Sequence, residues 1–339
     1  MYDFIKMPSD TKLEIIAAAS AQSGLSEHII EKDFWVSYLL DIIFNRIDLN
    51  HNFLFKGGTS LSKCYGVIER FSEDIDLVYS QEDFEFDYKE EYKNNEKLGS
   101  KKREKLIKSL VLEARKFTVE EFLPAIQKII DSDEIDDSYN LHISEDCATD
   151  LIFEYPSSID EDSKIQYLRP EIKIECGARS KMIPSSLVKV KTMLFDAIPS
   201  MNDSIKEIPV LNPSRTFWEK SMLLHTANMT NRLPHYGHRI SRHIYDIAQL
   251  YKSRLLDETL SDEELLLDVA KFSSIFFRAS LDYDEVNFAN FKLVPENEIL
   301  EQLREDYIKM NEMFYSDKIM PFEEIIEILK EIDKKIRKF

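Results

Sequence analysis

Two of the chain's seven glycines stand side by side, at Gly57 and Gly58, between a short apolar run and a run of helix-forming residues. A glycine pair at such a junction lets the backbone turn tightly and approach a ligand closely. The stretch FLFKGGTSLSK therefore predicts a strand, a glycine turn and a short helix, in that order. This order constrains the fold strongly, because it specifies two elements and the turn that joins them.

The segment after this helix carries two carboxylates, Asp74 and Asp76. From Glu73 to Tyr79, polar and apolar residues alternate, which is typical of a strand with one polar face. Ser72 and both aspartates would lie on that face. Two like charges so close together are costly unless a cation joins them, and carboxylate oxygens suit Mg²⁺. The pattern therefore predicts a site for Mg²⁺, or for Mn²⁺, on this strand.

A later stretch, RPEIKIECGARS, predicts another strand with charged residues on one face. Its alternation places Glu171, Lys173 and Glu175 together on that face. If this strand neighbours the first one, either glutamate could supply a third carboxylate for metal binding or base chemistry. The alternative interpretation of Glu175 is a surface residue paired with Lys173. The sequence leaves open which glutamate is the third carboxylate.

Together these features favour chemistry on a nucleotide. A glycine turn before a helix can place backbone N–H groups against phosphates, while a metal on paired aspartates stabilises the oxygens of an in-line displacement. Taken singly, each signal has a simpler interpretation, because a glycine pair is usually a turn and Asp-x-Asp is often a solvated strand end. The combination predicts nucleotidyl transfer, with an NTP as the substrate.

The same motifs resemble a known family. GGTSL followed by FSEDIDL resembles the DNA polymerase β-like nucleotidyltransferase superfamily, and KGGTSLSK with RFSEDIDL is similar to the AbiEii toxin family within it. IIEKDFWVSYLL, FWEK and SRHIYDIAQL resemble further segments of that family, so the resemblance spans residues 28 to about 250. It implies a Mg²⁺-dependent enzyme that transfers NMP from an NTP to an RNA (tRNA-like) or protein acceptor and releases pyrophosphate. It also implies the toxin of a toxin–antitoxin or phage-defence system, with an antitoxin protein as a partner.

The resemblance assigns roles to individual residues. It implies a metal site at Asp74 and Asp76, with Asp246 as the acid of the family's fourth motif and Lys220 on the phosphates. Glu175 remains the candidate third carboxylate. The candidate nucleotide-binding residues are Gly57, Gly58, Thr59, Ser72, Lys220 and Arg242.

The candidate residues in the C-terminal half also have structural interpretations. Lys220 follows Phe217 and Trp218, an apolar setting in which a charge needs a reason, yet it could be an exposed lysine beside Glu219. A helix over SRHIYDIAQL would place several polar residues on one face by their spacing of three and four. That face could position a substrate or form a structural network of ion pairs. Its members are Arg239, Arg242, His243 and Asp246.

The formal net charge of −19 argues against a protein that binds nucleic acid over its whole surface, because phosphate binding depends on clustered lysine and arginine. An RNA acceptor would need a local basic patch. The densest basic stretch begins near Asn94 and has helical spacing after Ser100, so it predicts either an RNA contact or a solvated helix face. The candidate RNA contacts are Lys101, Lys102, Arg103, Lys105 and Lys108.

The predicted fold class is α+β, a mixed nucleotidyltransferase sheet flanked by helices and followed by a helical domain. We place the first domain at residues 1–205, with N-terminal helices and a helical insertion near 82–137. The second, at 206–339, would complete the active-site cleft. The 339 residues show neither a signal peptide nor an apolar run long enough for a membrane span, so we expect a cytoplasmic protein without a membrane partner. The alternative function is a non-catalytic nucleotide-binding protein that acts through a protein partner.

Overall fold

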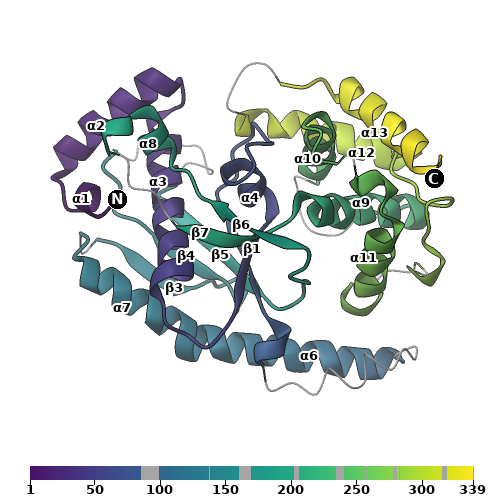
Figure 1. The fold of residues 1–339 in the computed structure, drawn as a ribbon, viewed down its shortest axis with the longest axis horizontal. Helices are drawn as coiled ribbons and strands as arrows, with labels where there is room; N and C mark the ends of the chain where they lie inside the picture. Colours follow the sequence, from purple (N-terminus) through teal and green to yellow (C-terminus); the bar gives the residue numbers. More distant parts are fainter. Residues whose placement is uncertain are drawn as a thin grey trace. The chain divides into compact units, whose positions relative to one another are not determined.

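The chain forms two compact units in the computed structural model (Figure 1). The first consists of Met1–Cys64 and Phe71–Val210, and the second of Tyr65–Arg70 and Leu211–Phe339. The second unit is therefore discontinuous, because it includes a short segment that lies between two parts of the first. The structure describes residues 1–84, 99–136, 138–159, 169–201, 206–233, 240–256, 258–277, 281, 283–314 and 319–338.

A seven-stranded mixed sheet with the order β3-β4-β5-β2-β1-β7-β6 is the centre of the first unit. Strand β2 is antiparallel to β1 and parallel to β5, while β4 is antiparallel to β5 and β7 is parallel to β1. This mixed sheet with flanking helices confirms the predicted α+β class. The strands are β1 (Phe53–Lys56), β2 (Ile75–Tyr79), β3 (Asn140–Ile143), β4 (Leu151–Glu154), β5 (Glu171–Gly177), β6 (Ser185–Lys189) and β7 (Glu207–Leu211).

β1 forms where the short apolar run predicts a strand and β2 forms where the alternation predicts one, but β6 and β7 were not predicted. β6 is mostly exposed at one end of the sheet, so its sequence lacks a buried face that would mark it as a strand. β7 contains Pro209, a residue type that is rare within sheets because it cannot donate to the ladder. It pairs with β1 at the single position Phe55↔Val210, so the proline does not interrupt a long ladder.

Helix α3 supplies much of the core of the first unit. Ser26 caps its start by accepting a hydrogen bond from the backbone N of Ile29 (3.4 Å). Farther along, the Trp35 ring packs on Phe153 and Tyr155, with ring centroids 5.9 and 5.7 Å away. The helices of this unit are α1 (Tyr2–Ile5), α2 (Ser9–Ser23), α3 (Glu27–Asp41), α4 (Gly57–Lys63), α6 (Ser100–Phe117), α7 (Leu123–Asp133) and α8 (Met193–Ala197), with π-helical turns at Ile42–Arg46 and Thr118–Phe122.

Helices α6 and α7 follow one another along one side of the unit (Figure 1) and form most of the predicted helical insertion. Its residues 85–98 and 137 lie outside the described residues. α6 is amphipathic, because Leu110, Ala114 and Phe117 are buried while its basic residues face outward.

The second unit is helical around Trp218, whose ring lies 6.0 Å from Phe288 and 5.6 Å from Phe291. Arg70, in the short segment, forms an isolated β-bridge with Phe314. Among the described residues, no helix is both long and apolar enough to cross a membrane. The helices are α9 (Pro213–Thr230), α10 (Ser241–Lys252), α11 (Glu263–Phe276), α12 (Asn297–Lys309) and α13 (Phe322–Ile336). Short 3₁₀ turns of the chain lie at Gln81–Asp83, Pro199–Met201, Thr259–Ser261, Tyr283–Glu285 and Met310–Met313.

Candidate active site

The glycine turn lies directly against one of the two predicted metal-binding aspartates. Gly57 begins α4 with φ +81°, a conformation that L side chains rarely adopt. A Cβ at this position would overlap the carboxylate of Asp76. The register of β1 and β2, which pairs Lys56 with Asp76, brings the two together. Glycine is therefore required at position 57 both by the backbone conformation and by the approach of Asp76.

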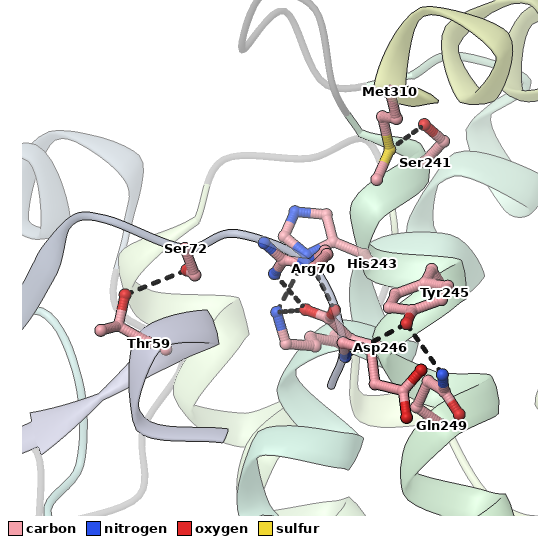
Figure 2. Close-up of polar contacts among 12 residues, drawn as sticks. Thr59, Arg70, Ser72, Ser241, His243, Tyr245, Asp246, Gln249 and Met310 are labelled. Carbon is pink, nitrogen blue, oxygen red and sulfur yellow. Dashed lines mark hydrogen bonds and ion pairs between the residues drawn. The ribbon is translucent and has the colours of Figure 1, made fainter. Parts of the chain in front are cut away.

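Thr59 connects α4 to the segment that leads into β2. Its Oγ1 lies 3.0 Å from Oγ of Ser72 (Figure 2) and 2.5 Å from the backbone oxygen of Asp74. The residue is only 1% exposed. Thr59 and Ser72, which we predicted to bind the nucleotide, are thus hydrogen-bonded to each other through their hydroxyls, and the hydroxyl of Thr59 faces inward.

The register of β2 and β5 places a third carboxylate beside the aspartates. Asp76 pairs with Glu175, and because paired residues of neighbouring strands face the same side, these side chains share one face of the sheet. Glu171 pairs instead with Glu154 on the opposite neighbour, β4. Geometry therefore distinguishes the two glutamates that the sequence could not.

Glu175 is held by a neighbouring lysine. Its Oε1 lies 2.9 Å from Nζ of Lys173, which also lies 3.0 Å from Oδ2 of Asp150. Burial lowers the pKa of Lys173, but the two carboxylates outweigh it and raise the pKa above its ordinary value. Glu175 is thus paired with Lys173, as its alternative interpretation had it, and also lies beside Asp76.

The side chains in this region are of the chemical type that binds a hard divalent cation. Asp74, Asp76 and Glu175 offer carboxylate oxygens, the donors that Mg²⁺ and Mn²⁺ prefer. Gly57 leaves room for the Asp76 carboxylate where a larger residue would displace it. In the part of the chain that the structure describes, no group of three or more His, Cys, Asp or Glu side chains is already arranged as a metal site.

A second polar cluster, in the second unit, centres on Asp246. Its carboxylate is 0% exposed and accepts hydrogen bonds from Nε and Nη2 of Arg70, at 2.7 and 2.8 Å. Nζ of Lys220 lies 2.9 Å from the same carboxylate and 3.3 Å from Nδ1 of His243. Figure 2 shows Arg70, at the end of the short segment, converging with His243 and Asp246 of α10, and Lys220 belongs to α9.

Burial and the neighbouring charges shift the pKa values of this cluster. Burial alone would raise the pKa of Asp246, but Arg70 and Lys220 hold it well below its ordinary range. Burial likewise lowers the pKa of Lys220, against the attraction of Asp246. Burial and the charges of Lys220 and Arg242 keep the pKa of His243 well below its usual value. Asp246 is therefore a charged carboxylate with two cationic partners.

The structure brings Lys220, His243 and Asp246 together and adds Arg70, which the sequence analysis missed. The sequence feature that could have indicated a partner such as Arg70 is the position of Asp246. Asp246 lies in the buried run Ile244–Ala248, where a carboxylate needs a cation. Arg242 is partly exposed, and Arg239 lies outside the described residues.

The candidate RNA contacts lie on the first turns of α6. Lys101, Lys102, Lys105 and Lys108 are exposed and Arg103 is partly exposed. Nζ of Lys108 lies 2.9 Å from Glu104, so the charge of Lys108 is partly balanced within the helix. Five basic residues against one acidic residue over positions 101–108 make this end of α6 basic.

Residues 38–328 match the family model described as the nucleotidyl transferase AbiEii toxin of type IV toxin–antitoxin systems. The chain belongs to the AbiEii nucleotidyltransferase toxin family. The family match includes both polar clusters. Among solved structures, the chain is similar to the nucleotidyltransferase toxin MenT4 of Mycobacterium tuberculosis H37Rv, at 14% identity, with a TM-score of 0.46 over 97% of this chain and 98% of that one. No curated protein matches the sequence. Membership of the AbiEii family confirms the resemblance predicted from the motifs.

Proposed function

We propose that this protein is a Mg²⁺-dependent nucleotidyltransferase that moves NMP from an NTP to a hydroxyl group of an RNA (tRNA-like) or protein acceptor. The observation that carries the proposal is the packing of the Asp76 carboxylate against Gly57, with Glu175 in register beside it. It places the turn that would approach the phosphates next to carboxylates that would hold the cation. Membership of the AbiEii family supports the same class of reaction.

In the proposed reaction, the acceptor oxygen attacks the α-phosphorus of the NTP. A bond forms between that oxygen and the phosphorus, the bond to the bridging oxygen breaks, and pyrophosphate leaves with the electron pair. Asp74 and Asp76 would hold Mg²⁺, which supplies positive charge for the phosphate oxygens when bound. Glu175 would either complete the metal site or take the proton of the attacking hydroxyl.

We propose that the nucleotide is bound by the backbone of Gly57 and Gly58 and by the side chains of Lys220 and Arg242. Lys220 would stabilise the charge that develops on the phosphates. Asp246 is fully buried, so we assign it a positioning role, in which it orients Lys220 and Arg70 rather than touching the substrate. Thr59 and Ser72 would act by joining the glycine turn to the Asp-x-Asp strand.

Membership of the AbiEii family supports a proposal for the cellular setting. We propose that the protein is the toxin of a toxin–antitoxin pair or phage-defence system, that it acts in the cytoplasm, and that an antitoxin protein is its partner. Such an enzyme would use cytoplasmic NTPs and inactivate its acceptor by adding a nucleotide to it.

The experiment that tests the reaction is incubation of the purified protein with each α-³²P-labelled NTP, Mg²⁺ and total cellular RNA or protein. We expect label to enter one class of macromolecule and pyrophosphate to be released, both abolished by EDTA and restored by Mg²⁺. If the protein binds NTP but no label is transferred, it is the non-catalytic nucleotide-binding protein that the sequence leaves as the alternative.

If the acceptor is RNA, we expect the basic residues of α6 to contribute to its binding. These residues are the local groups that an acidic protein would need to bind RNA, so their replacement by glutamine should weaken RNA binding and spare NTP binding. The salt dependence of RNA affinity should flatten by about one unit of log–log slope for each lysine or arginine that no longer binds a phosphate. Binding measured across a salt series checks this, with Lys128→Gln on the neighbouring α7 as the control. Unchanged affinity and slope would remove α6 from the acceptor site. The residues to replace are Lys101, Lys102, Arg103, Lys105 and Lys108.

A further inference from the structure

Three consecutive charged residues are buried in the middle of α3. Glu31, Lys32 and Asp33 are 2%, 1% and 6% exposed, and every residue from Ile30 to Leu40 is buried. Charges are rarely buried so completely, because desolvation is costly unless each charge has a partner. Each member of this trio has one, and the three partners lie in three separate segments of the first unit.

Lys32 contacts the start of the Asp-x-Asp strand. Its Nζ forms a partly buried ion pair with the carboxylate of Glu73, the residue directly before Asp74. The same ammonium group lies 5.7 Å from the centre of the Phe71 ring, which packs over it. Lys32 therefore holds the backbone at the point where the chain enters β2.

Asp33 contacts the far end of the glycine-turn helix. Its Oδ1 lies 2.5 Å from Nζ of Lys63, the last residue of α4, and its backbone oxygen accepts from the same Nζ at 3.3 Å. Its Oδ2 accepts from the backbone N of Met193 at 2.7 Å. Both carboxylate oxygens are thus engaged, which fixes the orientation of the side chain that holds α4.

These contacts form a closed ring with the link already described at Thr59. Helix α3 holds α4 through Asp33 and holds Glu73 through Lys32, while Thr59 of α4 bonds to the backbone oxygen of Asp74. In such a ring, movement of α4 relative to the entry of β2 must break at least one buried polar contact.

We infer that Lys32 and Asp33 are positioning residues that set the distance between the glycine turn and the metal-binding carboxylates. This inference rests on the proposed function for its catalytic consequence. Displacements of about 1 Å at a catalytic site cost roughly 10²-fold in rate, so a fixed separation has a direct effect on turnover. A buried apolar pair would fill the same space but would not specify the relative placement of the two segments by directed hydrogen bonds.

Glu31 provides a matched control within the same helix. It is as buried as its neighbours, and its carboxylate accepts hydrogen bonds from Oγ of Ser157 and from the backbone N of Ser158, both at 2.7 Å. These partners belong to the segment after β4, away in sequence from the glycine turn and from β2. Loss of Glu31 therefore removes an equally buried interaction without touching the ring.

The experiment compares Lys32→Met with Glu31→Gln. Both should lower the melting temperature, but only Lys32→Met should weaken binding of Mn²⁺, measured by electron paramagnetic resonance of the free ion without nucleotide. We expect about 10- to 100-fold weaker Mn²⁺ binding, as for other residues that orient metal ligands. We also expect turnover to fall by roughly 10²-fold in Lys32→Met alone. Equal effects in the two variants would show that Lys32 contributes only stability and would overturn the inference.

Two further variants keep the test informative if Lys32→Met does not fold. Lys32→Arg retains the charge and should keep Mn²⁺ affinity within a few-fold of the wild type. The double variant Lys32→Met with Glu73→Met replaces the ion pair by apolar side chains, which often restores stability. We expect it to fold and still bind Mn²⁺ weakly; wild-type affinity in the double variant would contradict the inference.

Hydrogen exchange separates this inference from the proposed function. Lys32→Met should speed amide exchange in residues 57–63 and 72–76, whereas Glu31→Gln should speed it near 155–158. This pattern does not depend on catalysis. If the wild type binds no Mn²⁺ and transfers no nucleotide, the proposed function fails, while the exchange pattern still decides whether Lys32 positions these segments. If Lys32→Met leaves amide exchange unchanged in residues 57–63 and in residues 72–76, the positioning role is refuted.

Discussion

Asp76 in the first unit and Asp246 in the second have opposite surroundings. Asp76 lies on the polar face of a strand, partly exposed, with the carboxylate of Glu175 in register beside it. Asp246 is completely buried and is bonded to two cationic side chains. Asp246 is already neutralised by Arg70 and Lys220, whereas Asp76 lies beside a second carboxylate, an arrangement that a bound cation would stabilise. The comparison separates a group that we propose to hold a metal from a group that holds other side chains.

The largest difference between the two regions should follow the removal of Asp74 or Asp76, which are partly exposed. Asp74→Ala or Asp76→Ala should reduce nucleotide transfer to background with little change in stability, because each removes a partly exposed carboxylate rather than a core group. Labelled-NTP transfer and thermal unfolding measure the two quantities. Asp10→Ala, an exposed carboxylate of α2, is the control and should behave as wild type. Wild-type turnover in a folded variant at either position would remove the metal assignment.

The opposite pattern is expected for the buried carboxylate. Asp246→Asn leaves Arg70 and Lys220 buried without their counter-charge, so it should cost about 3–5 kcal/mol of unfolding free energy. Urea denaturation measures this loss. Glu324→Gln, which removes a half-exposed ion pair with Lys252 in the same unit, should cost at most about 1 kcal/mol. Similar losses in the two variants would mean that the buried cluster contributes no more than a surface pair.

Much of the first region was predictable because its signals are local. The glycine pair, the alternation of β2 and the Asp-x-Asp spacing lie within a few residues of one another, and the structure places strand, turn, helix and strand accordingly. The position of Glu175 could not be predicted from local pattern, because only the pairing of β5 with β2 distinguishes it from Glu171. Local pattern gives the face of a strand but not its neighbour.

The second region was less predictable because its central contact is distant in sequence. Arg70 and Asp246 are 176 positions apart, and no periodicity connects them. Spacing on α10 did predict that His243 and Asp246 share a face, but the cation opposite Asp246 came from another segment. In the same way, Lys32 of α3 gave no local sign that Glu73 would be its partner.

An intermediate effect is expected from Gly57→Ala, which perturbs Asp76 without removing it. The added methyl group would displace the carboxylate, so we expect turnover to fall by roughly 10²-fold. Gly24→Ala is a matched control, because Gly24 has a similar φ of +75° but open space around it. Each variant should lose about 1–2 kcal/mol from backbone strain, as measured by urea unfolding. Equal turnover in the two variants would show that the contact with Asp76 is not functional.

The last expected effect is a difference in acid sensitivity between the units. Burial lowers the pKa of His225 to about 4 and that of His243 well below its ordinary value. Between about pH 6.5 and 4 the unfolded chain binds these protons and the folded chain does not, so stability of the second unit should fall as the pH falls, by at most about 1.4 kcal/mol per pH unit for each histidine. In the first unit, burial raises the pKa of Glu31, which acts in the opposite direction.

The two tryptophans allow this difference to be measured, because Trp35 lies in the first unit and Trp218 in the second. Urea unfolding of Trp35→Phe and Trp218→Phe, followed by fluorescence at several pH values, reports one unit at a time. His225→Asn keeps an acceptor for the backbone N of Lys292 and should make the pH dependence of the second unit shallower. Equal pH slopes for the two units would contradict the prediction.

The discontinuity of the second unit also affects how the protein is made. Tyr65–Arg70 belong to a unit whose other residues begin at Leu211, so Arg70 leaves the ribosome long before Asp246 is synthesised. At about 5–20 residues per second, the interval is roughly 10–35 s. During this time the nascent chain already carries Asp74 and Asp76 but has neither Lys220 nor Asp246. Translation itself therefore delays completion of the second unit, and a chain released before residue 246 would have Asp74 and Asp76 without the buried cluster.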